Sequence, residues 1–270
     1  MGGYRLHLNC TGTGPPGSPT VILESAFDDT SLAWTKVQPR VASFARVCSY
    51  DRAGYGWSDT GPAPRTAAHI VRELHTLLAR AGVPAPYVLV GHSYGGAVMQ
   101  LYAFTYQAQV AALVLVDSDH QDQQHHPDVA LEGPGLFRFC SAVAPFGVAR
   151  LLGFAFYNTS EYPANVEPEV QALDHQTRNC QTAGDELAAV PESLDQLAAA
   201  RHSLGNLPLI VITRGKQVSP SWPALQKDLV TLSSNGTQVI ATDSGHYIQL
   251  DQPDMVVEAI EQVVTTTSLK

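Results

Sequence analysis

Short apolar runs alternate with longer amphipathic stretches along the chain. The short runs, such as residues 87–90 and 111–116, are apolar almost throughout, which is typical of strands buried on both faces of a sheet. The longer stretches keep helical spacing, as at Ile70, Leu74 and Leu77. These patterns predict strands at residues 4–8, 21–23, 45–50, 87–90, 111–116, 207–213 and 238–242, and helices at 66–81, 96–107 and 255–264.

This alternation predicts an α/β fold with a mostly parallel sheet flanked by helices. The alternation of predicted strands and helices stops between residues 118 and 206, which contain helical patches but no convincing strand. We therefore expect a core formed by residues 1–117 and 207–270, with residues 118–206 inserted as a helical lid.

Composition narrows the class of protein. The 270 residues are 44% hydrophobic and 15% charged, which is typical of a soluble globular domain. The net charge of −9 argues against nucleic acid as a partner. No run of about eighteen apolar residues predicts a membrane span. Residues 1–8 carry no secretory signal, so a cytoplasmic location is the default expectation. The sequence leaves the oligomeric state undetermined.

Four cysteines leave two interpretations open. Their spacing contains no C-x-x-C pair, so we expect no zinc site, and nothing else in the chain predicts a metal or a cofactor. They are either buried thiols or two disulfides, Cys10–Cys48 between neighbouring strands and Cys140–Cys180 within the insertion. Pairing, or removal of an upstream signal, would instead indicate a secreted or periplasmic protein.

The segment Gly91-His92-Ser93-Tyr94-Gly95 fits the pattern G-x-S-x-G between a predicted strand and a predicted helix. Such a tight turn forces Ser93 to a strained, positive φ and lifts its hydroxyl above the sheet. A serine hydroxyl needs a base to become a nucleophile. Of the ten histidines, His246 lies between the last strand and the last helix, where its loop can reach Ser93. His92 is expected to point away from Ser93.

Three motifs in this order resemble the α/β-hydrolase superfamily over nearly the whole chain. They are the elbow at 91–96, the turn Asp51-Arg52-Ala53-Gly54-Tyr55-Gly56-Trp57-Ser58, and Gly245-His246. The resemblance implies an eight-stranded, mostly parallel sheet and a nucleophile, acid and base in that chain order. It also implies a lid inserted after the sixth strand.

The position of the acid departs from the usual pattern. Family members usually place it after the seventh strand, yet residues 209–219 contain no carboxylate and carry Arg214 and Lys216 instead. Some lipases and haloalkane dehalogenases place it at the end of the sixth strand. There the chain has Asp117, which we predict to be the acid, with Asp119 as the alternative and Glu24 as a more remote candidate.

The oxyanion of a tetrahedral intermediate needs two backbone N–H donors. Tyr94, directly after the nucleophile, is expected to supply one. By resemblance the other comes from the loop after the strand at 21–23. Family members usually read His-Gly-x there, whereas this chain reads Ser25-Ala26-Phe27. Counting back from Trp34 indicates Phe27 as the donor, with Ala26 as the alternative.

Five of the eight phenylalanines lie within the insertion at residues 137–156. Part of them should form the lid's own core, and Phe137 and Phe154 are candidates for contacting substrate. The sequence therefore predicts a serine hydrolase that cleaves small apolar carboxylic esters without a cofactor or metal. Amides, lactones and thioesters would use the same machinery. A ligand-binding or receptor-like protein with little turnover is the alternative from another class, because the usual acid position is empty.

Overall fold

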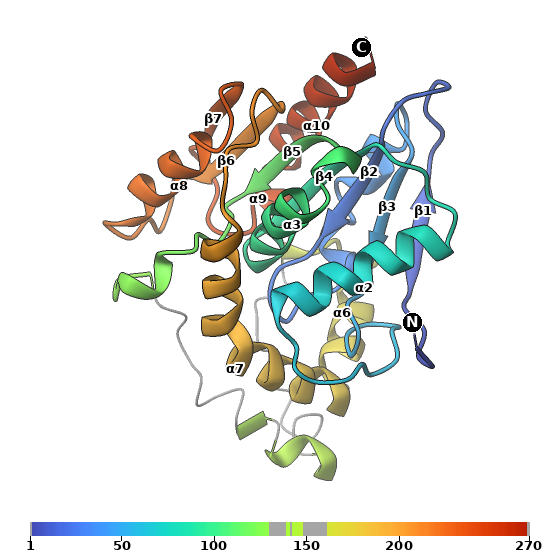
Figure 1. The fold of residues 1–270 in the computed structure, drawn as a ribbon. Coiled ribbons are helices and arrows are strands. Elements are labelled where there is room, and N and C mark those ends of the chain that lie inside the picture. The colour runs from blue at the N-terminus through green and yellow to red at the C-terminus, as the bar shows by residue number, and fades with distance from the viewer. Residues whose placement is uncertain (1, 130–138, 141, 148–160, 269–270) are drawn as a thin grey trace.

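Seven strands form one sheet in the computed structural model, which describes residues 2–129, 139–140, 142–147 and 161–268 (Figure 1). Their order across the sheet is β1-β3-β2-β4-β5-β6-β7, with β1 antiparallel to β3 and every other pair parallel. The strands are β1 (Leu8–Thr11), β2 (Thr20–Glu24), β3 (Val47–Tyr50), β4 (Tyr87–His92), β5 (Val110–Val116), β6 (Leu209–Arg214) and β7 (Gly236–Ala241).

Helices connect the parallel strands and cover both faces of the sheet (Figure 1). The α-helices are α1 (Gln38–Val41), α2 (Ala67–Arg80), α3 (Tyr94–Thr105), α6 (Glu167–Asp174), α7 (Thr177–Ala200), α8 (Trp222–Val230), α9 (Ile248–Asp251) and α10 (Pro253–Ser268). Short 3₁₀ helices lie at η1 (Ser31–Trp34), η2 (Gln107–Gln109), η3 (Gln123–His125) and η4 (Ala144–Phe146). None of the helices in the described ranges is long and apolar enough to cross a membrane.

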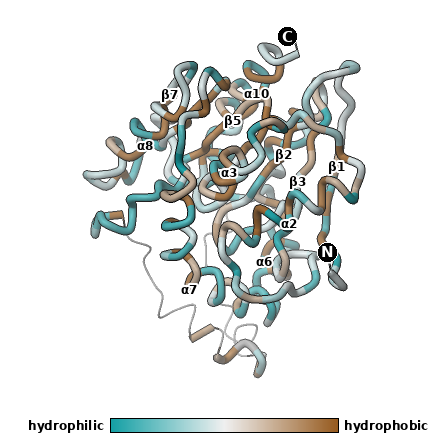
Figure 2. Tube along the Cα trace, in the orientation of Figure 1, coloured by the Kyte–Doolittle hydropathy of each residue, from teal (hydrophilic) through white to brown (hydrophobic). Residues whose placement is uncertain are grey.

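The central strands β4 and β5 are mostly apolar because each of their faces packs against helices. Leu89 of β4 joins a core cluster with α2 and α3, whereas its neighbours Val88 and Val90 join a second cluster with α10. Side chains alternate between the faces of a strand, so a strand covered twice needs apolar residues at every position. Figure 2 shows this apolar character along β5. The predicted α/β class and mostly parallel sheet are confirmed.

The N-terminal part differs from the prediction. The strand expected at residues 4–8 is wrong, since β1 begins at Leu8. The preceding residues bond instead to the turn after β3, where Asp51 N donates to His7 O and Asp59 N donates to Arg5 O. The first strand is therefore displaced toward the C-terminus, to Leu8–Thr11. The described residues form seven strands, whereas the resemblance implied eight.

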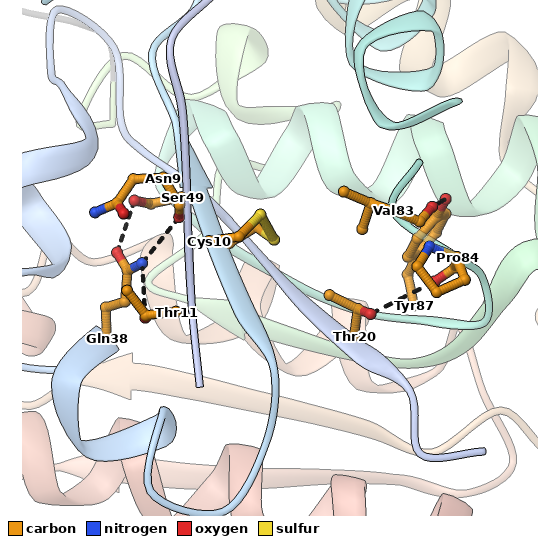
Figure 3. Close-up of a disulfide and its surroundings, with 10 residues drawn as sticks. Asn9, Cys10, Thr11, Thr20, Gln38, Ser49, Val83, Pro84 and Tyr87 are labelled. Carbon is orange, nitrogen blue, oxygen red and sulfur yellow. Dashed lines mark hydrogen bonds between the residues drawn. A yellow bond between two sulfur atoms is a disulfide. The ribbon is translucent and has the colours of Figure 1, made fainter. Parts of the chain in front are cut away.

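Both cysteine pairs are disulfide-bonded, so the interpretation as buried thiols is wrong. Cys10 and Cys48 lie directly opposite each other on β1 and β3. Figure 3 shows this disulfide close to Gln38, which donates to Asn9 O and accepts from Ser49 Oγ. Disulfides persist in oxidising compartments, and the location of this protein stays a prediction.

The described part of the segment between β5 and β6 is helical. The second half of α7 packs into the α2–α3 cluster through Val190, Leu194 and Leu197. Its first half carries Cys180, whose disulfide to Cys140 joins it to the segment before it. The described segment thus contacts the core along α7. Phe137 and Phe154 lie outside the described residues.

Candidate active site

Ser93 occupies the sharp turn between β4 and α3. Its φ of 53° lies in the left-handed region, and its backbone oxygen accepts from Gly96 N and Asp119 N. The neighbouring Gly91 and Gly95 are required because a larger side chain would clash with nearby backbone atoms. A Cβ at Gly91 would lie 2.5 Å from Gly95 O, and one at Gly95 would lie 2.3 Å from Ser25 O. Only a chain with glycine at both places can bring the serine to this position.

His246 and Asp117 are brought together by the ends of two strands and the loop after β7. His246 Nδ1 lies 2.6 Å from Asp117 Oδ2, within hydrogen-bond distance. Asp117 is fully buried and follows β5 directly. Burial alone would raise the pKa of Asp117, but the hydrogen bond and charge of His246, with Arg214, hold it below the ordinary value. The carboxylate is therefore ionised and His246 Nδ1–H is the donor.

Two further groups hold Asp117. Trp222 Nε1 donates to Oδ1 at 2.7 Å, and Arg214 donates to Oδ1 from its backbone N and to Oδ2 from Nη1. The carboxylate thus receives four donated hydrogen bonds, counting that of His246. Arg214 lies where family members usually have the acid, and the sequence indicated its position by the basic residues found there in place of a carboxylate. Trp222 was missed, because no local pattern links it to Asp117.

The His92 ring bonds to residues of the loop and helix that follow β7, and no hydrogen bond joins it to the Ser93 hydroxyl among the described residues. Gln249 Nε2 donates to His92 Nδ1 at 3.0 Å, so His92 Nε2 carries the proton that it donates to His246 O at 2.8 Å. Burial, with the nearby His246, lowers the pKa of His92 to about 3. A neutral imidazole therefore positions the backbone of His246.

The Ser93 hydroxyl contacts the alternative acid. Ser93 Oγ lies 3.5 Å from Asp119 Oδ1, at the limit of a hydrogen bond, and no hydrogen bond joins Ser93 to His246 within the described chain. Burial raises the pKa of Asp119. Asp119 thus faces Ser93, whereas Asp117 faces His246. Catalytic contacts between serine and histidine are often long without substrate.

The loop after β2 lies against the elbow, since Ser25 O is the atom nearest to a Cβ placed on Gly95. Ala26 is buried and Phe27 is half-buried. Tyr94 begins α3, and N–H groups in the first turn of a helix have no acceptor within it. Both expected oxyanion donors, Phe27 and Tyr94, therefore belong to segments that meet at the elbow.

Two buried acids follow on the same loop. Asn179 of α7 donates to Asp28 Oδ1 at 2.8 Å, and Tyr162 donates to Asp29 Oδ1 at 3.2 Å. Burial raises the pKa of Asp29 to about 7. Asp29 Oδ2 is buried without a hydrogen-bond partner among the described residues. Residues from the inserted segment thus hold the loop on which Phe27 lies.

A cavity of about 500 Å³ opens beside His246. Its lining is mostly polar and consists of Glu161, Lys216, Gln217, Asp243, Gly245, His246, Tyr247 and Asp251. The part of this cavity that the described chain forms can therefore solvate a polar group or water next to the histidine. No group of three metal-ligating side chains that could hold an ion occurs within the described ranges.

Comparisons with known proteins agree with this architecture. A model of the alpha/beta hydrolase family matches residues 13–259. The uncharacterized protein YqjL of Bacillus subtilis is 28% identical over 249 residues, covering 90% of this chain and 83% of its own. One similar structure is the epoxide hydrolase CorEH, with a TM-score of 0.72 and 19% identity, covering 98% of this chain and 96% of its own. Another is a thermophilic esterase from Thermogutta terrifontis with malate bound, with a TM-score of 0.70 and 21% identity, covering 98% of this chain and 94% of its own.

Proposed function

Because this chain belongs to the α/β-hydrolase family, we propose that it is a serine hydrolase that cleaves carboxylic esters through an acyl-enzyme on Ser93. The observation that carries the proposal is the 2.6 Å hydrogen bond between His246 Nδ1 and the buried Asp117. It supports an orientation of the His246 ring in which Nδ1 faces Asp117, so that Nε2 is the nitrogen left to accept a proton from a serine hydroxyl.

The proposed reaction has two halves. His246 Nε2 takes the proton of Ser93 Oγ as the oxygen attacks the ester carbonyl, and the same proton is then given to the departing alcohol. Water, activated by His246, releases the acid from Ser93. Asp117 stays ionised and stabilises the imidazolium in both halves. The N–H groups of Tyr94 and Phe27 bind the oxyanion, with Ala26 as the alternative donor.

The similar structures do not indicate which type of bond this protein cleaves, since at this sequence identity they show the fold alone. Ser93 favours esters over epoxides and haloalkanes, because hydrolases of this fold that open those substrates use a carboxylate nucleophile. Amides, lactones and thioesters remain within reach of the same chemistry. The residues 118–206 are proposed as a lid whose Phe137 and Phe154 contact an apolar acyl group, and the polar cavity beside His246 suits the alcohol and water.

Turnover of p-nitrophenyl acetate and butyrate tests the proposal, together with labelling by a fluorophosphonate. Ser93→Ala should retain less than about 1% of the activity and lose labelling, because the serine provides the covalent step. The matched control is Ser49→Ala, which removes another buried hydroxyl. That hydroxyl donates to Gln38 and not to a residue of the elbow, so the variant should remain active. A wild-type protein that labels at Ser93 but never turns over would instead favour the receptor-like alternative.

A further inference from the structure

All five N–H donors of the Arg52 guanidinium are used inside the protein. Nη1 donates to Glu24 Oε1 and to Ser25 O, both at 2.8 Å. Nη2 donates to Ala26 O at 2.8 Å and to Glu186 Oε2 at 3.0 Å, and Nε donates to Glu186 Oε1 at 3.0 Å. The side chain is only 1% exposed. A guanidinium with every donor satisfied in a buried site has one orientation.

Two of these five bonds go to backbone carbonyls of the loop that carries the proposed oxyanion donor. The carbonyl of Ala26 and the N–H of Phe27 belong to one planar, trans peptide, in which they point in opposite directions. Arg52 holds the Ala26 carbonyl, so the Phe27 N–H is turned away from Arg52. The bond to Ser25 O fixes the preceding peptide, which carries the Ala26 N–H, in the same way.

Glu186 determines how the guanidinium is turned. It binds the Nε–Nη2 edge with both carboxylate oxygens, and its Oε2 also accepts from Tyr55 OH at 3.0 Å. A bidentate pair fixes the plane of an arginine more strictly than a single contact does. Glu186 is fully buried and lies on α7, within the segment inserted between β5 and β6.

We infer that Arg52 is a positioning residue for the oxyanion hole and that Glu186 of the inserted segment holds it in place. The inference rests on the proposed function. It makes α7 part of the structure that orients the Phe27 N–H, and not only a cover over the substrate.

The test uses Glu186→Gln in the full chain. Glutamine can still accept at one oxygen, but its amide places N–H donors against an N–H donor of Arg52 and removes the compensating charge. The matched control is Glu73→Gln, which makes the same change in another buried pair, Glu73 with Arg65 at 3.0 Å, whose contacts do not involve this loop.

Three measurements are compared in both variants: kcat and KM for p-nitrophenyl butyrate, the inhibition constant of a trifluoromethyl ketone, and amide hydrogen exchange of residues 25–29. The ketone adds to the serine and places an oxyanion in the hole, so it reports the hole directly. Loss of one oxyanion donor costs about a hundredfold or more, so partial misalignment in Glu186→Gln should lower kcat about tenfold to a hundredfold. Inhibition should weaken by the same factor, KM should change little, and loop exchange should accelerate. Glu73→Gln should change none of these.

The inference is overturned if Glu186→Gln loses thermal stability as Glu73→Gln does but binds the ketone as tightly as the wild type. Should Glu186→Gln fail to fold, Tyr55→Phe removes a single bond to Glu186 and should give a smaller change in the same direction, and an unchanged ketone affinity would overturn the inference. A wild-type protein that hydrolyses no ester and does not react at Ser93 refutes the proposed function separately. The exchange rates of residues 25–29 then decide whether Glu186 holds the loop.

Discussion

Replacing Asp117 by asparagine keeps the shape of the side chain but exchanges one acceptor oxygen for an NH₂ donor. Asp117 Oδ1 receives Trp222 Nε1–H and the backbone N–H of Arg214, neither of which can turn into an acceptor. The asparagine oxygen must therefore stay on that side. Its NH₂ group then faces His246 Nδ1, where the wild type has Oδ2.

In the Asp117→Asn variant we expect His246 to change its tautomer. With a donor opposite Nδ1, the ring accepts there and carries its proton on Nε2, so it cannot take the proton of Ser93. We expect Asp117→Asn to lower kcat by about three to four orders of magnitude, which corresponds to about 4–5 kcal/mol of transition-state stabilisation. KM should stay nearly unchanged, because the carboxylate does not touch the substrate.

Steady-state hydrolysis of p-nitrophenyl butyrate measures both constants, and the rate of fluorophosphonate labelling checks the activation of Ser93 without turnover. Asp119→Asn is the control, because this neighbouring buried aspartate contacts Ser93 and not His246. It should cost less than tenfold. An Asp117→Asn variant within tenfold of the wild type would refute the reasoning, and a reversed order of the two variants would assign the acid to Asp119.

Two further predictions concern stability. Burial raises the pKa of Asp29 to about 7, compared with about 4 in an unfolded chain, so the folded wild type loses stability as the pH rises from about 4 to about 7. Asp29→Asn should therefore raise the melting temperature at pH 8 more than at pH 5. An equal effect at both pH values would contradict this. The Cys10–Cys48 disulfide closes a separation of 38 residues, so the double change Cys10→Ser and Cys48→Ser should lower the free energy of unfolding by about 4 kcal/mol in denaturant titrations, whereas an unchanged midpoint would show that the bridge does not form.

Local patterns in the sequence correctly predicted those parts of the fold that depend on residues close together in the chain. The helix expected at 66–81 is α2 at Ala67–Arg80, and the strand expected at 111–116 lies within β5 at Val110–Val116. The turn at Ser93 followed from its flanking glycines, since a tight turn needs small residues within two positions. These features were predictable because their causes lie within a few residues of each other. The strand expected at residues 4–8 failed because a turn more than forty residues away supplied its hydrogen-bond partners.

The candidate site shows the same division. Asp117 and His246 were predicted as acid and base from their places after predicted strands, because parallel strands bring those ends to one edge of the sheet, and from the resemblance to family members with an acid after the sixth strand. The groups that hold them were not, since Trp222 lies 105 positions from Asp117 in the chain. Arg52 and Glu186 are separated by 134 positions, and only the packing of α7 against the core places them in contact. By itself the sequence determined which residues carry the proposed chemistry, whereas tertiary structure decided which buried partners orient them, because those partners come from segments that only folding brings together.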